Sequence, residues 1–328
     1  MRKKNHIFIK FLIISIILIL LFMVSLLFGR YNDVFSTNFS DLFGDDSAIN
    51  TILFSIRLPR ILAAILIGGS LSVSGAAFQG IFKNPLVSPD LLGASSGACF
   101  GAALGILLSF SYFLTTSISF IFGIISVILV YILFKFSKTN KILSIVLAGI
   151  MISSLFSAMT SFIKLVADTE SKLPSITYWL MGNLSSIKIE DIYYLAPVII
   201  ISMIPILLLS WRINLLTLSD IEAKSLGVNV NLLSLVVIVC STIMTSISVS
   251  VSGMIGWVGL VIPHLSRKIF GHDFRLIFPA SFLLGGIFLL ICDDISRCLL
   301  FTEIPIGILT AFVGAPSFFY MLFKRRKI

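Results

Sequence analysis

The sequence predicts an all-α, polytopic membrane protein with about ten transmembrane helices. Hydrophobic residues make up 58% of the 328 residues, the mean hydropathy is +1.10, and only 12% of the residues are charged. A soluble globular protein carries about 25% charged residues. Residues 11–28 and 91–116 contain no charge at all, and roughly 18 such residues can span a bilayer as a helix. A transmembrane barrel would need short strands of alternating polarity, so a helical bundle is indicated.

Ten apolar segments follow one another along a single domain, residues 1–328. The first follows Arg2, Lys3 and Lys4, but it exceeds the apolar region of a signal peptide and no small-residue cleavage site follows it, so we expect a retained helix. Gly253 is the expected break between the seventh and eighth helices. The ten expected helices are 7–28, 58–82, 91–110, 112–134, 142–166, 192–210, 232–252, 254–267, 276–293 and 304–323.

The distribution of charge predicts the orientation. If the helices alternate from a cytoplasmic N-terminus, most Lys and Arg residues fall in the inside segments and most Asp and Glu residues outside. An excess of Lys and Arg in short cytoplasmic loops sets membrane topology, so we expect both termini in the cytoplasm. The net charge of +9 is then a topology signal, which argues against nucleic-acid binding.

The motif R-L-P-R at residues 57–60 opens the second expected helix on its outer side. Arg57 and Arg60 can be interfacial arginines that reach the lipid headgroups, with Pro59 tolerated in the first turn. Alternatively, they are exposed cations that orient a negatively charged partner. Arg297 is a third arginine expected on the outer side.

Glycines recur every fourth residue in the third expected helix, at Gly93, Gly97, Gly101 and Gly105. A stripe without side chains lets a neighbouring helix approach closely, so helix packing is the favoured interpretation. The same segment fits G-x-S-x-G at residues 93–97, the serine-hydrolase pattern. The strand-turn-helix context of a nucleophile is absent, although His264 is also expected near the cytoplasmic surface, so an intramembrane protease stays open.

The longest cytoplasmic connection, residues 211–231, contains its own helix signal. Ser219 and Glu222 fit a capping box, and Gly227 suits the left-handed position after a helix end. A helix of about seven residues is unstable alone in water. It therefore either packs on its own membrane domain or docks a cytoplasmic partner.

Two absences bear on the energy source. The sequence has no G-x-x-x-x-G-K-[ST] phosphate loop, and the expected helix interiors hold almost no ionisable relay of the kind that ion-coupled carriers use. The four cysteines lack metal-type spacing, and no cofactor or metal is expected. A stand-alone secondary carrier remains an alternative, but energy supplied by a partner fits better.

Several motifs together resemble the iron-siderophore, haem and vitamin B12 permease family of ABC importers (FecCD/BtuC-like). Glu222, Ala223 and Gly227 match the E-A-A…G loop of ABC importer permeases. The other motifs are R-L-P-R at 57–60, G-A-A-F-Q at 75–79, N-P-L at 84–86, L-L-G at 91–93, W-L-M-G at 179–182, G-L-V-I-P-H at 259–264, I-P-I-G at 304–307 and G-A-P at 314–316.

The resemblance implies a BtuC-like ABC importer permease fold in the bacterial cytoplasmic membrane. It implies a second permease subunit, the same chain or a relative, and cytoplasmic ATPase subunits, so that the chain itself is no enzyme. ATPase coupling then falls on the loop that contains Ser219, Asp220, Glu222, Ala223, Leu226 and Gly227.

Outside the membrane, the resemblance implies a solute-binding protein or lipoprotein that docks acidic residues on Arg57, Arg60 and Arg297. Asp293 and Asp294 depart from the family pattern, which has one aspartate before the arginine. The implied cargo is an iron chelate, most readily a ferric siderophore, with haem or cobalamin as alternatives.

Overall fold

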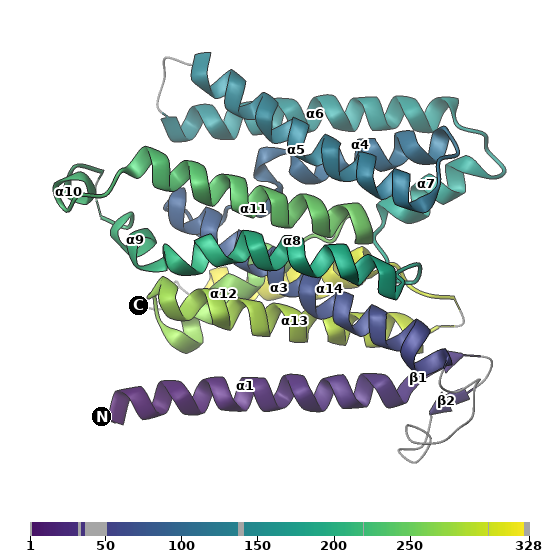
Figure 1. Cartoon of the computed structure of the whole chain (residues 1–328), viewed down its shortest axis with the longest axis horizontal. Coiled ribbons are helices and arrows are strands. Elements are labelled where there is room, and N and C mark those ends of the chain that lie inside the picture. The colour runs from purple at the N-terminus through teal and green to yellow at the C-terminus, as the bar shows by residue number, and fades with distance from the viewer. Residues whose placement is uncertain are drawn as a thin grey trace.

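Over the residues that the structure describes, the fold is a bundle of ten principal helices (Figure 1). The computed structural model describes residues 2–31, 34–36, 51–136, 141–218, 220–300 and 302–324. The principal helices are α1 (Arg2–Leu27), α3 (Leu58–Ile81), α4 (Ala94–Leu107), α5 (Tyr112–Phe136), α6 (Lys141–Val166), α8 (Ile189–Leu208), α11 (Val230–Ser252), α12 (Val258–Phe270), α13 (Phe274–Cys298) and α14 (Ile306–Lys324).

These helices match the ten expected segments one to one, which confirms the fold class. Within the described residues, seven helices are long and apolar enough to cross a membrane, and α4 and α14 contain shorter apolar helices. The expected break at Gly253 is confirmed, because α11 ends at Ser252 and Gly253 takes a positive φ of 70°. The chain then runs without helix to Val258, so α12 is only 13 residues long.

Several short elements were not expected from the sequence. Strands β1 (Phe28–Tyr31) and β2 (Val34–Ser36) form an antiparallel hairpin, which is a small correction to a purely helical chain. A π-helix, η2 (Thr51–Arg57), leads into α3, and a 3-10 turn, η3 (Pro89–Leu92), leads into α4. The others are α7 (Lys172–Leu180), α9 (Ser210–Leu215) and α10 (Asp220–Ser225), of which only a short helix near α10 was expected.

The bundle has two distinct ends along its long axis. Figure 1 shows the N-terminus of α1 and the short helix α10 at one end, called here the α10 end, and the β1–β2 hairpin at the other, called the hairpin end. Hydrogen bonds fix both ends of α1 to the bundle: Lys10 Nζ donates to the Ile269 carbonyl at 2.7 Å, and Arg57 Nη1 donates to the Leu26 carbonyl at 2.8 Å.

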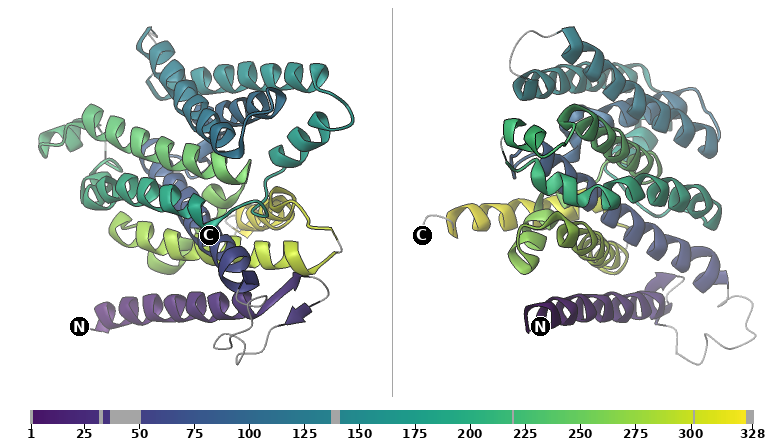
Figure 2. Two further views of the ribbon diagram at one scale, coloured as in Figure 1. Left: turned by 45° about the vertical axis from the view of Figure 1, so that its right-hand side comes forward. Right: turned by 60° about the vertical axis from the view of Figure 1, so that its left-hand side comes forward.

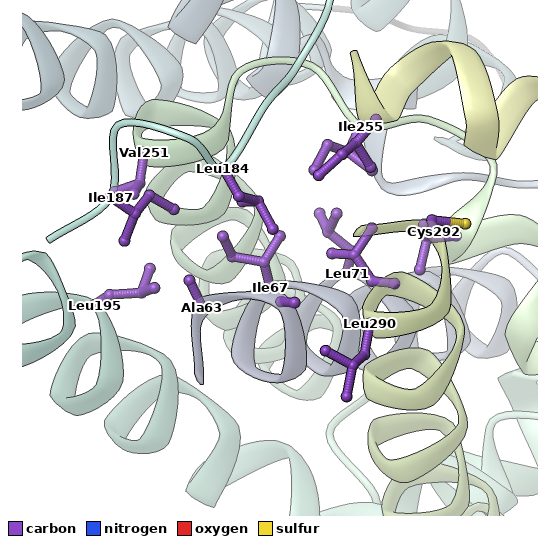
Figure 3. Close-up of a cluster of buried hydrophobic side chains, with 14 of the residues drawn as sticks. Ala63, Ile67, Leu71, Leu184, Ile187, Leu195, Val251, Ile255, Leu290 and Cys292 are labelled. Carbon is purple, nitrogen blue, oxygen red and sulfur yellow. The ribbon is translucent and has the colours of Figure 1, made fainter. Parts of the chain in front are cut away.

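Helix α3 lies at the centre of the bundle. Most of its residues are buried, and it packs on α8, α11, α12 and most extensively α13. Figure 3 shows Ala63, Ile67 and Leu71 of α3 pointing among Leu195 of α8 and Leu290 of α13. The two views in Figure 2 show α4, α5 and α6 as a separate layer on the opposite side of the bundle from α1. Helix α3 is therefore in direct contact with four neighbouring helices.

The glycine stripe of α4 faces α5, with one exception. An added Cβ would lie 2.5 Å from the Phe122 carbonyl oxygen at Gly97, and 2.8 Å from the Ile118 carbonyl oxygen at Gly101. At Gly105 it would lie 2.9 Å from Thr115. Gly93 instead has a φ of +77°, precedes α4 and faces Ser153 of α6. Three of the four glycines thus allow the close α4–α5 contact.

Substitution of Gly101 by leucine is expected to destabilise the protein by about 3 kcal/mol or more, because the new side chain collides with the backbone of α5. The measurement is the melting temperature of the detergent-solubilised protein by size-exclusion fluorescence. Gly256→Leu is the control, since an added Cβ there meets nothing within 4 Å among the described residues. Equal melting temperatures for the two variants would contradict the close α4–α5 packing.

Candidate docking and coupling sites

Arg60 and Arg297 lie in a buried ionic cluster at the hairpin end. Arg60 Nε is 2.7 Å from Asp293 Oδ1, and Arg60 Nη1 is 2.8 Å from Glu303 Oε1. Arg297 Nε is 3.1 Å from Asp293 Oδ2. Arg297 also pairs with Asp294, and its Nη2 donates to Ser25 Oγ of α1 at 2.6 Å. The cluster therefore joins α1, α3, α13 and the segment before α14.

Burial of the three arginines corrects the expectation that they are exposed. Arg57, Arg60 and Arg297 are only 3%, 5% and 7% exposed. Arg57 donates to the Leu26 and Leu27 carbonyls, which lack intrahelical partners at the end of α1. The arginines can be buried because the protein itself provides their partners. The end of α1 provides carbonyl acceptors, and the nearby carboxylates provide negative charge.

The carboxylates of this cluster differ in their access to solvent. The side chain of Asp293 is 0% exposed, whereas those of Asp294 and Glu303 are 26% and 37% exposed. Asp293 contacts both Arg60 and Arg297, so it is the central group of the cluster. Asp294 and Glu303 form its outer rim.

Helix α10 lies at the opposite end and exposes one large apolar side chain beside the charged Glu222 and Lys224. Ile221 is 81% exposed and Leu226 is 59% exposed, while Ala223 is 1% exposed and faces the body of the protein. Gly227 has a φ of +79°, and its N–H donates to the Lys224 carbonyl at 2.9 Å. This confirms a left-handed helix end. Ser219 and the side chain of Asp220 lie outside the described residues, so the capping box stays a prediction.

A polar contact fixes the neighbouring helix α9 to the start of α13. Asn214 Nδ2 donates to Asp273 Oδ1 at 2.7 Å, and the Phe274 N–H donates to Asn214 Oδ1 at 2.8 Å. Arg275 pairs with Asp273 at 2.7 Å and lies over the ring of Trp211 at 5.0 Å. No local pattern predicts this contact, because Asn214 and Asp273 are 59 positions apart.

The Asp273 contact predicts a pH dependence of stability. Hydrogen bonds from Arg275 and then Asn214 hold the pKa of Asp273 at about 2, below the usual value of about 3.9. Because the folded-state pKa is depressed, this stabilisation is complete above about pH 4 and is lost as the pH falls towards 2. We expect the melting temperature to fall more steeply from pH 4 to pH 2 in the wild type than in Asp273→Asn. Parallel curves would contradict the contact.

A second polar contact lies near the same end. Arg267 Nη2 of α12 donates to Gln79 Oε1 of α3 at 2.5 Å, and Gln79 Nε2 donates to the Val87 carbonyl at 3.2 Å. Both side chains line a cleft of about 310 Å³, together with Lys83 and Asn84. The end of α3 is thereby linked to α12 and to the loop that follows α3.

The G-x-S-x-G segment does not have the arrangement of a hydrolase. Ser95 is 1% exposed, and its hydroxyl donates to Asp90 of η3. The turn η3 packs among α3, α4, α5, α6 and α11, and Asp90 is partly buried there. Among the described residues, no group of three His, Cys, Asp or Glu side chains could hold a metal ion.

An apolar cavity of about 660 Å³ opens between α7, α14 and the segment before α12. Its lining residues are Leu180, Met181, Met254, Gly256, Trp257, Gly307, Ile308, Ala311, Phe312, Ala315 and Pro316. Phe312 at its edge is 75% exposed. The W-L-M-G, I-P-I-G and G-A-P motifs each contribute residues to this cavity.

A many-helix membrane domain without a phosphate loop, and with an exposed short helix at one end, has the organisation of an ABC transporter permease. The chain belongs to the FecCD transport family, whose model matches residues 17–324. This confirms the resemblance found in the motifs.

Individual relatives agree with the family assignment and differ in their named cargo. The molybdate import system permease protein MolB of Haemophilus influenzae is 39% identical over 96% of this chain and 95% of its own. A Helicobacter pylori protein named "probable iron chelatin transport system permease protein" is 37% identical over 100% of both chains. A solved structure described as an inward-facing conformation of a metal-chelate type ABC transporter has a TM-score of 0.88 and 39% identity, covering 95% of this chain and 97% of the other.

Proposed function

We propose that the chain is the membrane subunit of an importer that moves an iron chelate across the cytoplasmic membrane, driven by ATP hydrolysis on a separate subunit. Membership of the FecCD transport family and the short helix α10, which exposes Ile221, carry this proposal. The ATPase subunit binds α10, through Ile221 and Leu226, and the α10 end faces the cytoplasm together with both termini. The full chain acts as one permease domain and pairs with a second permease subunit.

Charge supports this orientation. Basic residues outnumber acidic ones among the described residues near the α10 end, where Lys10, Lys83, Lys224, Arg267 and Arg275 lie with Asp220, Glu222 and Asp273. At the hairpin end, Arg57, Arg60 and Arg297 are offset by Asp293, Asp294 and Glu303. A positive cytoplasmic face is the usual arrangement in membrane proteins.

A solute-binding protein, or lipoprotein, docks at the hairpin end in this proposal. Because Arg60 and Arg297 already have internal partners, an acidic residue of the docking protein would take the place of Asp294 or Glu303, the two partly exposed carboxylates. In docking, the arginines then stay in place, and a carboxylate of the docking protein replaces a carboxylate of this chain as their partner. Glu303→Gln is expected to strengthen docking, because it removes a competing charge, and weaker docking would contradict the exchange.

The proposed cargo is an iron chelate. Relatives named for molybdate and for iron chelatin are similarly close. A ferric siderophore is proposed, with haem and cobalamin as the alternatives, since the motifs of the chain resemble those of permeases for these chelates.

The test is to express the chain with its neighbouring genes, purify the complex and identify partners and bound ligand by mass spectrometry. An uptake panel of radiolabelled ferric siderophore, haem, cobalamin and molybdate then ranks the cargo. We expect an ATPase subunit in the complex and uptake of the siderophore. Uptake that persists without any ATPase partner would overturn the proposal in favour of a secondary carrier.

A further inference from the structure

Lys83 adopts a backbone conformation that is unfavourable for lysine. Its φ is +51° at the position just after the end of α3, where the Lys83 N–H donates to the Gly80 carbonyl at 3.4 Å and the Asn84 N–H to the Gln79 carbonyl at 3.3 Å. This is the position that glycine usually takes after a helix, because a Cβ strains the left-handed conformation. The side chain of Lys83 must therefore supply something that glycine cannot.

The side chain reaches across the protein to the chain just before α10. Lys83 Nζ donates to the Leu218 carbonyl at 2.7 Å, 135 positions away. A lysine after a helix commonly interacts with the last carbonyls of its own helix. Here the ammonium instead joins the end of α3 to the connection between α9 and α10.

Within the described part of the chain, α10 is held to the bundle by a small set of contacts. Its main packing neighbour is α11, and Ala223 is its deeply buried side chain. On the other side α9 is fixed to α13 through Asn214 and Asp273. The Lys83–Leu218 bond thus links the base of α10 to α3, the central helix of the bundle.

We propose that Lys83 is a positioning residue that ties α10 to the end of α3, so that the two move as one body when a partner displaces α10. This inference rests on the proposed ATPase contact for its role in transport, but the tie itself is a property of this chain. Displacement of α10 would then reach α8, α11, α12 and α13, because α3 packs on all four. Without the tie, α10 could move while α3 stays in place.

The experiment measures the distance between spin labels on Leu86→Cys and Lys224→Cys by double electron–electron resonance, in a background without the four native cysteines. Leu86 is 51% exposed and Lys224 is exposed, so neither label disturbs the interior. Lys83→Gly is the decisive variant, because it relaxes the backbone strain and removes only the side chain. Lys83→Arg is the matched control, since it keeps a cationic donor.

In the wild-type background and in Lys83→Arg, a single narrow distance distribution is expected in the permease alone. The same distribution is expected in the complex with its co-purified ATPase subunit, with or without ATP and vanadate. In Lys83→Gly, the fraction of molecules with the wild-type distance between the two labels is expected to fall roughly fivefold, which is the effect of losing one hydrogen bond. The mean distance between the labels should also shift when nucleotide binds. Lys83→Gly should melt no lower than the wild type.

The outcomes separate this inference from the proposed function. A distribution in Lys83→Gly as narrow as in the wild type, in both nucleotide states, would overturn the tie. If no ATPase subunit binds the wild-type chain, the proposed function fails, while the measurement on the permease alone still decides the tie. A broad wild-type distribution would also contradict it.

Discussion

Replacing Asp293 by asparagine is expected to destabilise the protein by about 3–5 kcal/mol, the typical cost of breaking a buried ion pair. Asp293 has no exposed side-chain surface and contacts both Arg60 and Arg297. Its loss leaves two buried guanidinium groups with less counter-charge. The measurement is thermal unfolding of the purified protein in detergent.

The matched control is Asp294→Asn, at the next position. Its side chain is 26% exposed and pairs with Arg297 at the rim of the cluster, so its loss should cost less than the loss of Asp293, because water can reach this side of the cluster. Adding Arg60→Met to Asp293→Asn should restore part of the stability, because it removes one buried charge that has lost part of its counter-charge. Equal effects of the two single substitutions would contradict the central place of Asp293.

Replacing Ile221 by aspartate is expected to release the ATPase subunit. Ile221 is 81% exposed on α10, and removing an apolar anchor from the centre of an interface costs about 2 kcal/mol or more, about thirtyfold in affinity. The change should leave the melting temperature unaltered, because most of the side chain faces away from the protein. The measurement is the amount of ATPase subunit that co-purifies.

Leu108→Asp supplies the same kind of change at the other end of the bundle, since Leu108 is 52% exposed at the end of α4. It should keep the ATPase subunit bound. Loss of the subunit in both variants, or in neither, would be inconsistent with a specific contact at α10.

The helices were predictable because each one needs only local information. An apolar run between charged residues defines α6 or α13, and a glycine between two runs located the break at Gly253. The short element α10 was also indicated, by Glu222 and Gly227 at the spacing of a helix start and end. Helix α7 was missed because its nine residues are too few to span a membrane and lie between polar segments.

The sites were harder to predict because they depend on residues far apart in the sequence. Arg60 was singled out, but its partners Asp293 and Glu303 lie 233 and 243 positions away. No local pattern shows that these side chains meet, and so the arginines were expected to be exposed. Lys83 offered only a hint, as a charged residue directly after a helix and before Asn84 and Pro85, and its positive φ emerges only from the structure.

Membrane-impermeant thiol labelling of Lys224→Cys, in the cysteine-free background, tests most directly whether α10 is the cytoplasmic contact. For the permease expressed without its ATPase subunit, the account predicts no labelling in intact cells and full labelling in inverted membrane vesicles, because Lys224 lies on the exposed helix proposed to meet that subunit. Labelling of residue 224 in intact cells would place α10 outside the cell and contradict the account.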